Sequence, residues 1–146
     1  MPDGTVHILL VEDDSVDAEA ITRAFRKEKI ANPIHTASDG VTALHMLRGD
    51  TTRSPLPRPY LILLDLNLPR MNGIEFLDVL RHDPYLRDSI VFVLTTSNAE
   101  KDKIAAYAYN VAGYLTKANA GGDFLHLVHM LDYYWHYIEF PPESHR

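Results

Sequence analysis

The stretch YLILLD at Tyr60–Asp65 decides the fold, because five consecutive apolar residues run directly into a carboxylate. A short and continuously apolar run of this kind is typical of a strand that is buried on both faces of a parallel sheet. Four further segments carry a similar β-rich character and are predicted to be strands: 6–11, 34–37, 90–94 and 112–116.

Segments with apolar residues at helical spacing alternate with these strands. Helices are predicted over 16–29, around 41–47, around 74–82, over 99–110 and over 123–137. Ser15 is the expected cap of the first helix, and the proline-rich stretch 50–59 is expected to be an exposed loop. Five strand–helix units with short joins imply a parallel sheet wrapped by helices on both sides. We expect one domain over 1–146, with 138–146 as a C-terminal extension and no output domain.

Composition narrows the function classes. The 146 residues include 14 Lys plus Arg against 20 Asp plus Glu, which gives a formal net charge of −6 and argues against a nucleic-acid-binding surface. Cysteine is absent, so disulfides, thiolate metal sites and cysteine nucleophiles are excluded. The sequence has no apolar run of membrane-spanning length and does not start like a signal peptide, so we expect a cytoplasmic protein without membrane contact.

Polar residues gather where the predicted strands end, which is the edge at which open parallel sheets bind their ligands. They are Glu12, Asp13 and Asp14 after the first strand, Asp65 after the third, Thr95, Thr96 and Ser97 after the fourth, and Lys117 after the fifth. Carboxylates held close together repel one another unless a cation lies between them, and hard oxygen ligands suit Mg²⁺, with Mn²⁺ also possible. A carboxylate such as Asp65 can also act as the nucleophile of phosphoryl transfer, with a lysine and a hydroxyl around the phosphorus.

The segments LLVEDD, LILLDLNLPRMNG, VLTTS and GYLTK together resemble the receiver domain of bacterial two-component response regulators. The resemblance implies an α/β fold, a doubly wound five-stranded parallel sheet in the order 2-1-3-4-5 within a flavodoxin-like three-layer sandwich. It also implies roles for individual residues: Asp65 as phosphoacceptor, Glu12 and Asp13 as the acidic pair, Asn67 as a Mg²⁺ ligand through its backbone carbonyl, Thr95 as switch hydroxyl with Thr96 beside it, Tyr114 as switch aromatic and Lys117 as phosphate-binding lysine.

What the resemblance implies about function is a switch and not an enzyme. A sensor histidine kinase is expected to phosphorylate Asp65 with Mg²⁺, and the signal is expected to leave through the fourth helix, fifth strand and fifth helix. At most, slow autophosphorylation from small donors and autodephosphorylation are expected. Two positions depart from the family pattern: Ala118 stands where proline is usual, and Thr96 where a smaller residue is usual.

A narrower resemblance comes from TTS, KANAGGDF and the aromatic last helix, which are similar to the regulators paired with bacterial phytochromes. Apolar residues cover much of that helix, more than packing on the sheet requires. A homodimer through the last helix and tail is therefore predicted, with the contact residues Leu127, Met130, Tyr134, Trp135, Tyr137 and Phe140.

Other interpretations stay open. A pseudo-receiver would bind partners without phosphorylation, and Ala118 keeps that alternative in place. A phosphohydrolase of the haloacid dehalogenase type would need an acid two residues after the nucleophile, where this chain has Asn67. A flavin or nucleotide binder would place phosphate against Glu12, Asp13 and Asp14, which would repel it. Asp14 and Asp17 are interpreted as charges of the first helical turn, and His126 and His129 as surface histidines.

Overall fold

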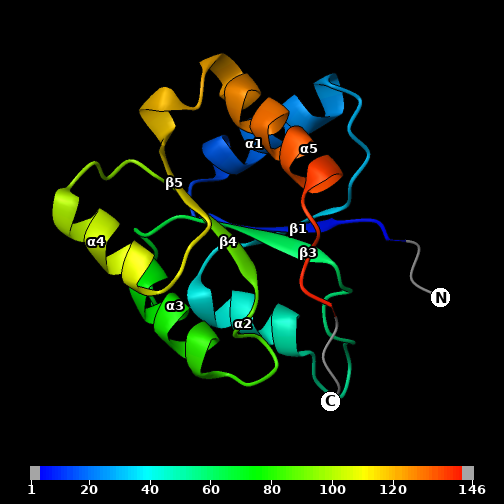
Figure 1. Cartoon of the computed structure of the whole chain (residues 1–146), viewed down its shortest axis with the longest axis vertical. Coiled ribbons are helices and arrows are strands. Elements are labelled where there is room, and N and C mark those ends of the chain that lie inside the picture. The colour runs from blue at the N-terminus through cyan, green and yellow to red at the C-terminus, as the bar shows by residue number, and fades with distance from the viewer. Residues whose placement is uncertain (1–3, 143–146) are drawn as a thin grey trace.

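The structure is a computed structural model that describes residues 4–142. Five parallel strands form one sheet in the order β2-β1-β3-β4-β5, which confirms the predicted order (Figure 1). The strands are β1 (His7–Val11), β2 (Ile34–Ala37), β3 (Tyr60–Leu64), β4 (Ile90–Thr95) and β5 (Gly113–Thr116).

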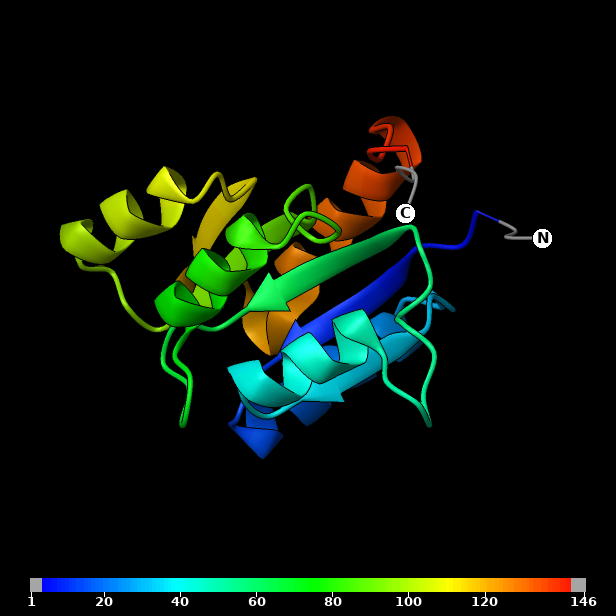
Figure 2. The ribbon, with the colours of Figure 1, turned by 90° about the horizontal axis from the view of Figure 1, so that it is seen from below.

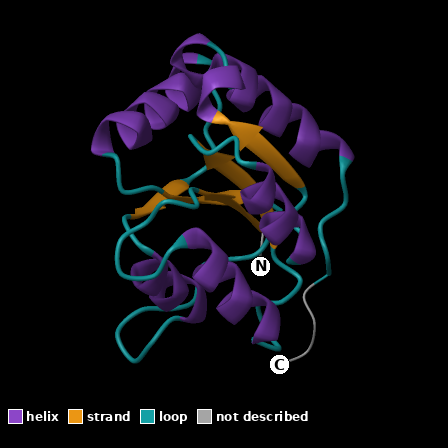
Figure 3. Ribbon diagram, turned by 90° about the vertical axis from the view of Figure 1, so that its left-hand side faces the viewer, coloured by secondary structure: helices purple, strands orange, loops and turns teal. Residues whose placement is uncertain are grey.

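Helices cover both faces of this sheet, as Figures 1, 2 and 3 show from three directions. They are α1 (Ser15–Lys27), α2 (Gly40–Arg48), α3 (Gly73–His82), α4 (Glu100–Ala108) and α5 (Leu125–Tyr137). Helices α1 and α5 lie on one face, and α2, α3 and α4 lie on the other. Two short 3₁₀ turns, Lys117–Asn119 and Gly122–Phe124, connect β5 to α5.

Burial of the central strand separates the core into two clusters. All of β3 is buried, and its side chains alternate between the faces: Ile62 and Leu64 pack toward α2 and α3, and Leu61 and Leu63 toward α1 and α5. This double burial is the reason that the strand is continuously apolar in sequence. The doubly wound α/β fold predicted from the sequence is therefore confirmed.

The predicted helix ends at 29 and 110 each lie two residues beyond the observed ends, Lys27 and Ala108. Two predicted helix starts were also wrong, for local reasons. Asp14, and not Ser15, caps α1, because its extended backbone lets the carboxylate accept from the amides of Val16 at 2.9 Å and Asp17 at 3.1 Å. Helix α5 begins at Leu125, because Asp123 and Phe124 adopt left-handed backbone angles with φ of 53° and 62°. Such angles interrupt a right-handed helix.

The turn that follows β3 is held by very close packing at Gly73. A Cβ atom at this position would lie 2.6 Å from the Cα of Leu66 and 2.7 Å from the carbonyl oxygen of Asp65. Asn72 and Glu75 add a reciprocal capping box at the start of α3. The start of α3 is thus fixed against the backbone of Asp65.

Arg81, near the end of α3, lies at the end of the sheet where the strands begin and connects two loops there. Its guanidinium donates hydrogen bonds to four backbone carbonyls: Tyr109 at 2.6 Å, Arg87 at 2.7 Å, Ser89 at 2.8 Å and Asn110 at 3.0 Å. These carbonyls belong to the α3–β4 connection and to the end of α4. One side chain therefore joins two connections at the end of the molecule away from the carboxyl ends of the strands.

The last helix buries more of its apolar surface in its own chain than was predicted. Leu127 is 0% exposed, so the prediction that it contributes to a dimer contact was wrong: the side chain fills the core under α5. Trp135 stacks on Phe25, and Tyr134 packs edge-on against Phe92. Over residues 4–142, no helix combines the length and apolar character needed to cross a bilayer.

Candidate functional site

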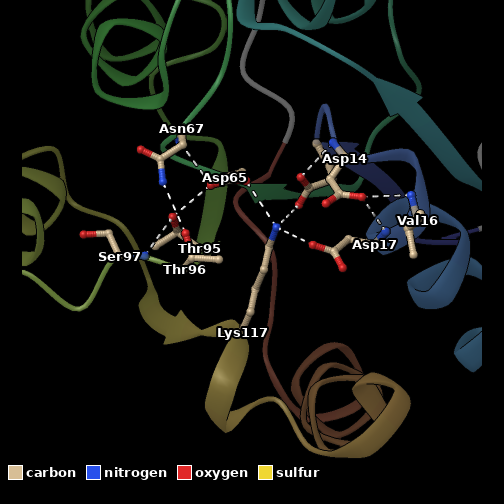
Figure 4. A network of polar contacts seen from close by, with 10 residues as sticks. Asp14, Val16, Asp17, Asp65, Asn67, Thr95, Thr96, Ser97 and Lys117 are labelled. Carbon is tan, nitrogen blue, oxygen red and sulfur yellow. Dashed lines mark hydrogen bonds and ion pairs between the residues drawn. The ribbon is translucent and has the colours of Figure 1, made fainter.

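The sheet brings the predicted polar residues together at the carboxyl ends of its strands. Val11 pairs with Leu64 in the β1–β3 register, so the residues that follow them, Glu12 and Asp65, lie side by side. Thr95 ends β4, and Lys117 follows β5. Figure 4 shows Asp65, Thr95 and Lys117 pointing toward one another.

Asp65 is the centre of this group and is only 5% exposed. Its Oδ1 accepts hydrogen bonds from the Thr95 hydroxyl at 2.8 Å and from the Asn67 backbone amide at 3.0 Å. Its Oδ2 faces the Lys117 ammonium at 3.3 Å. The two oxygens are thus distinguished: a neutral pair of donors holds one, and the other is directed toward a positive charge.

An acidic set surrounds Asp65. One carboxylate oxygen each from Glu12, Asp13 and Asp65 lies within 4.8 Å of the others. Burial, together with the charge of Asp65, raises the pKa of Glu12 to about 7, although the hydrogen bond from Lys117 acts in the opposite direction. Three crowded carboxylates, one of which ionises with difficulty, have the donor chemistry that suits a hard divalent cation. Asp13 is exposed, which leaves this set open to solvent.

Lys117 neutralises part of this charge. Its ammonium lies 2.8 Å from Glu12 Oε1 and 2.7 Å from Asp17 Oδ2, besides the contact with Asp65. Burial by itself would lower the pKa of this lysine, but the hydrogen bonds to Asp17 and Glu12 and the charge of Asp65 raise it above its usual value. Lys117 is therefore charged at neutral pH.

Asp17 is the site residue that the sequence analysis missed. The only signal in the sequence was its nearness to the acidic pair, because Asp17 lies in the first turn of the helix that follows Glu12 and Asp13. The first-turn position of α1 suggested only an interaction with the helix dipole. Figure 4 instead shows the Asp17 carboxylate directed at Lys117.

Three further predicted residues line the rim. The side-chain amide of Asn67 donates to the exposed Thr96 hydroxyl over 3.4 Å, so these two residues meet across the site. The hydroxyl of the partly buried Tyr114 donates to the Ser97 carbonyl at 2.9 Å. Tyr114 thus touches the loop that follows Thr95 and does not contact Asp65 directly.

Because the pKa of Glu12 is raised, stability should depend on pH through this residue. The folded state holds the Glu12 proton up to about pH 7 and the unfolded state only up to about 4.5, so this contribution is lost as pH rises between these values. We expect the difference in free energy of unfolding between Glu12→Gln and the parent to change with pH. In urea unfolding with a chelator present, it should shift in favour of the variant by on the order of 2 kcal/mol from pH 5 to pH 8. Glu19→Gln, at an exposed position of α1, is the control. A difference between Glu12→Gln and parent that stays constant with pH would contradict the expectation.

Comparisons with known proteins match most of the chain. The model of the response regulator receiver domain matches residues 8–129. Response regulator Rcp1 of Synechocystis is 38% identical over 128 residues, which are 88% of this chain and 87% of Rcp1. The phosphorylated cyanobacterial phytochrome response regulator RcpA superposes with a TM-score of 0.82 at 34% identity, covering 92% of this chain and 97% of RcpA.

The structure of Mn²⁺-bound Rcp1 superposes with a TM-score of 0.81 at 36% identity, covering 94% of this chain and 99% of that one. These matches confirm the predicted resemblance to regulators associated with phytochromes. The chain therefore belongs to the response regulator receiver domain family of two-component signalling.

Proposed function

We propose that this protein is a phosphorylation-activated switch that accepts a phosphoryl group from a histidine kinase onto Asp65. One observation carries the proposal: Asp65 is buried, with one oxygen on the Thr95 hydroxyl and the other facing the Lys117 ammonium. Asp13 and Glu12 complete a set of oxygens for a divalent ion beside it. A carboxylate that merely capped a turn would need neither the lysine nor the acidic neighbours.

The proposed reaction is an in-line phosphoryl transfer. An Asp65 oxygen forms a bond to phosphorus while the N–P bond of a phosphohistidine breaks, and the imidazole nitrogen keeps the electron pair and is protonated by solvent. The product is an acyl phosphate on Asp65. Thr95 can donate its hydroxyl, and Lys117 its ammonium, to the phosphoryl oxygens on which charge accumulates.

A divalent ion, Mg²⁺ or Mn²⁺, would be held by Asp13, Glu12, Asp65 and the backbone carbonyl of Asn67. When bound, it would neutralise charge on the transferred group. Mn²⁺ is bound in the structure of the relative Rcp1. The crowded carboxylates and the raised pKa of Glu12 support a cation at this place in the present chain.

The proposed output face is formed by α4, β5 and α5. A phosphoryl group on Asp65 would attract the Thr95 hydroxyl, and Tyr114 lies next to the loop that Thr95 would pull. Ile104 and Tyr107 of α4 are 66% and 51% exposed, which leaves apolar surface for a partner there. The relative RcpA is a phytochrome response regulator, and a phytochrome-type histidine kinase is accordingly the proposed phosphodonor.

The proposed domain organisation is a single receiver with a C-terminal extension over 138–146. In the described part of this extension, Phe140 packs edge-on against Tyr134 of α5. Residues 143–146 lie outside the described residues.

The function is tested by incubating the chain with Mg²⁺ and acetyl phosphate and measuring intact mass. We expect the mass of one phosphoryl group to be added, stable to acid and labile to base, and no addition in EDTA. Phosphotransfer profiling against purified histidine kinases then identifies the donor. A chain that stays unmodified with every donor would favour the pseudo-receiver alternative, and continuous release of phosphate would favour the phosphohydrolase.

A homodimer through α5 and the tail is proposed as well. Tyr133 and Tyr137 are 69% and 76% exposed, stack on each other at 5.8 Å and lie beside the 45% exposed Ile138. Of the predicted contact residues, Tyr137 belongs to this surface, whereas Met130, Tyr134, Trp135 and Phe140 are partly buried against the core. Exposed aromatic pairs of this kind are typical of protein contacts.

In light scattering, we expect the parent to have twice the mass of the chain. The double variant Tyr133→Ser/Tyr137→Ser should weaken the dimer about tenfold or more, because interface aromatics carry much of the binding energy. Tyr107→Ser removes a tyrosine of α4 that is also exposed, at 51%, and serves as the control. A monomeric parent, or dissociation caused by Tyr107→Ser alone, would contradict a contact through α5.

A further inference from the structure

The ammonium of Lys117 is shared by carboxylates from three parts of the chain. Glu12 follows β1, Asp17 lies in the first turn of α1, and Asp65 follows β3. Two of the three, Glu12 and Asp65, also belong to the acidic set whose oxygens lie within 4.8 Å. The ammonium and a divalent ion therefore compete for Glu12 and Asp65. Asp17 is not one of the carboxylates of the acidic set, so it is available to the ammonium alone.

Distances and exposure distinguish Asp17 from the other two partners. Its contact with Lys117 is the shortest, at 2.7 Å, and the contact with Asp65 is the longest, at 3.3 Å. The side chain of Asp17 is 26% exposed, against 2% for Glu12 and 6% for Asp65. Asp17 is thus the most exposed of the three partners and the one that does not belong to the acidic set.

Charge determines what the ammonium does when a cation enters. A divalent ion placed among Glu12, Asp13 and Asp65 repels the ammonium and offers those carboxylates a stronger partner. Without another anion nearby, Lys117 would have to leave for solvent or keep its hold on Glu12 and Asp65. Asp17 supplies that anion while the ammonium stays within reach of Asp65.

We propose that Asp17 is a positioning residue that receives the Lys117 ammonium when Glu12 and Asp65 bind the divalent ion. This inference rests on the proposed function, since it concerns the metal and the lysine of that site. Asp17 acts through Lys117 and does not contact the reacting atoms. It keeps the lysine close enough to contact a phosphoryl group on Asp65 and prevents it from blocking the metal ligands.

The test is a calorimetric titration of the full chain with Mn²⁺ at pH 8, without phosphodonor. We expect Asp17→Asn to weaken Mn²⁺ binding about fivefold, since the ammonium then keeps Glu12 and Asp65. Asp17→Glu, which keeps the carboxylate, should bring the affinity back toward that of the parent. Glu19→Gln removes an exposed charge from the same helix and should leave the affinity unchanged.

Asp17→Asn also removes a negative charge that attracts the metal ion through space, and this loss alone would weaken metal binding. The decisive measurement is therefore Asp17→Asn in a Lys117→Met background. With no ammonium to receive, Asp17→Asn should change Mn²⁺ affinity less than twofold there. A fivefold effect of Asp17→Asn that persists in the Lys117→Met background would overturn the proposal. So would an Asp17→Asn variant that binds Mn²⁺ as tightly as the parent.

Failure of the wider function looks different. If the parent binds no Mn²⁺ and takes up no phosphoryl group, both the proposed function and the role of Asp17 are wrong. A parent that binds Mn²⁺ and is phosphorylated, while the effect of Asp17→Asn survives in Lys117→Met, removes only the role of Asp17.

Discussion

Asp65→Asn is expected to abolish phosphorylation of the chain. An amide has no free carboxylate oxygen with which to attack phosphorus, so no acyl phosphate can form at this position. The substitution keeps the shape of the side chain and an oxygen that can accept from Thr95 and from the Asn67 amide, as Asp65 does. Loss of labelling would therefore report lost chemistry and not a lost fold.

The measurement is the intact-mass assay with Mg²⁺ and acetyl phosphate, accompanied by circular dichroism. Asp123→Asn is the matched control, because Asp123 is exposed between β5 and α5, and asparagine tolerates its left-handed backbone. The control should be labelled like the parent. Phosphoryl uptake by Asp65→Asn at another residue would refute the assignment of the acceptor.

Gly73→Ala is expected to destabilise the fold by about 3 kcal/mol, a large effect for one added methyl group. The methyl would lie 2.6 Å from the Cα of Leu66 and 2.7 Å from the carbonyl oxygen of Asp65. Both contacts are with backbone, which cannot rotate away as a side chain can. The start of α3 must then move relative to the end of β3.

Urea unfolding of the parent and the variant measures this cost. Gly122→Ala adds the same methyl where no atom lies within 4 Å, so its free energy of unfolding should stay within about 0.5 kcal/mol of the parent. A Gly73→Ala variant as stable as this control would show that the turn can relax, and that Gly73 does not fix the position of Asp65.

Strand-end chemistry could be predicted from the sequence because it depends on topology alone. Once β1, β3, β4 and β5 are neighbours and parallel, Glu12, Asp65, Thr95 and Lys117 must meet at one edge. The apolar run of β3 was equally readable, because burial on both faces requires it. These features follow from the periodicity and the order of the elements.

What escaped prediction depends on local angles and on side-chain reach. Asp14 and Ser15 are both good caps, and only the backbone angles of Asp14 show which residue caps α1. Leu127 was predicted to be a dimer contact because helical periodicity does not show which apolar residues of a helix are buried against its own sheet. Asp17 and Lys117 are 100 residues apart, and their contact depends on how far the lysine side chain extends.

The Arg81 junction has a mechanical consequence for the helix next to the site. Arg81 holds the carbonyls of Tyr109 and Asn110, and the Tyr109 hydroxyl bonds to Asp78, so the C-terminal end of α4 is anchored to α3. At the other end, Ala99 offers α4 no side-chain cap. The Ser97 hydroxyl, in the loop after Thr95, donates to Asp102 in the first turn of α4. A displacement of that loop would therefore be passed to the N-terminal end of α4, while the end anchored at Arg81 stays in place.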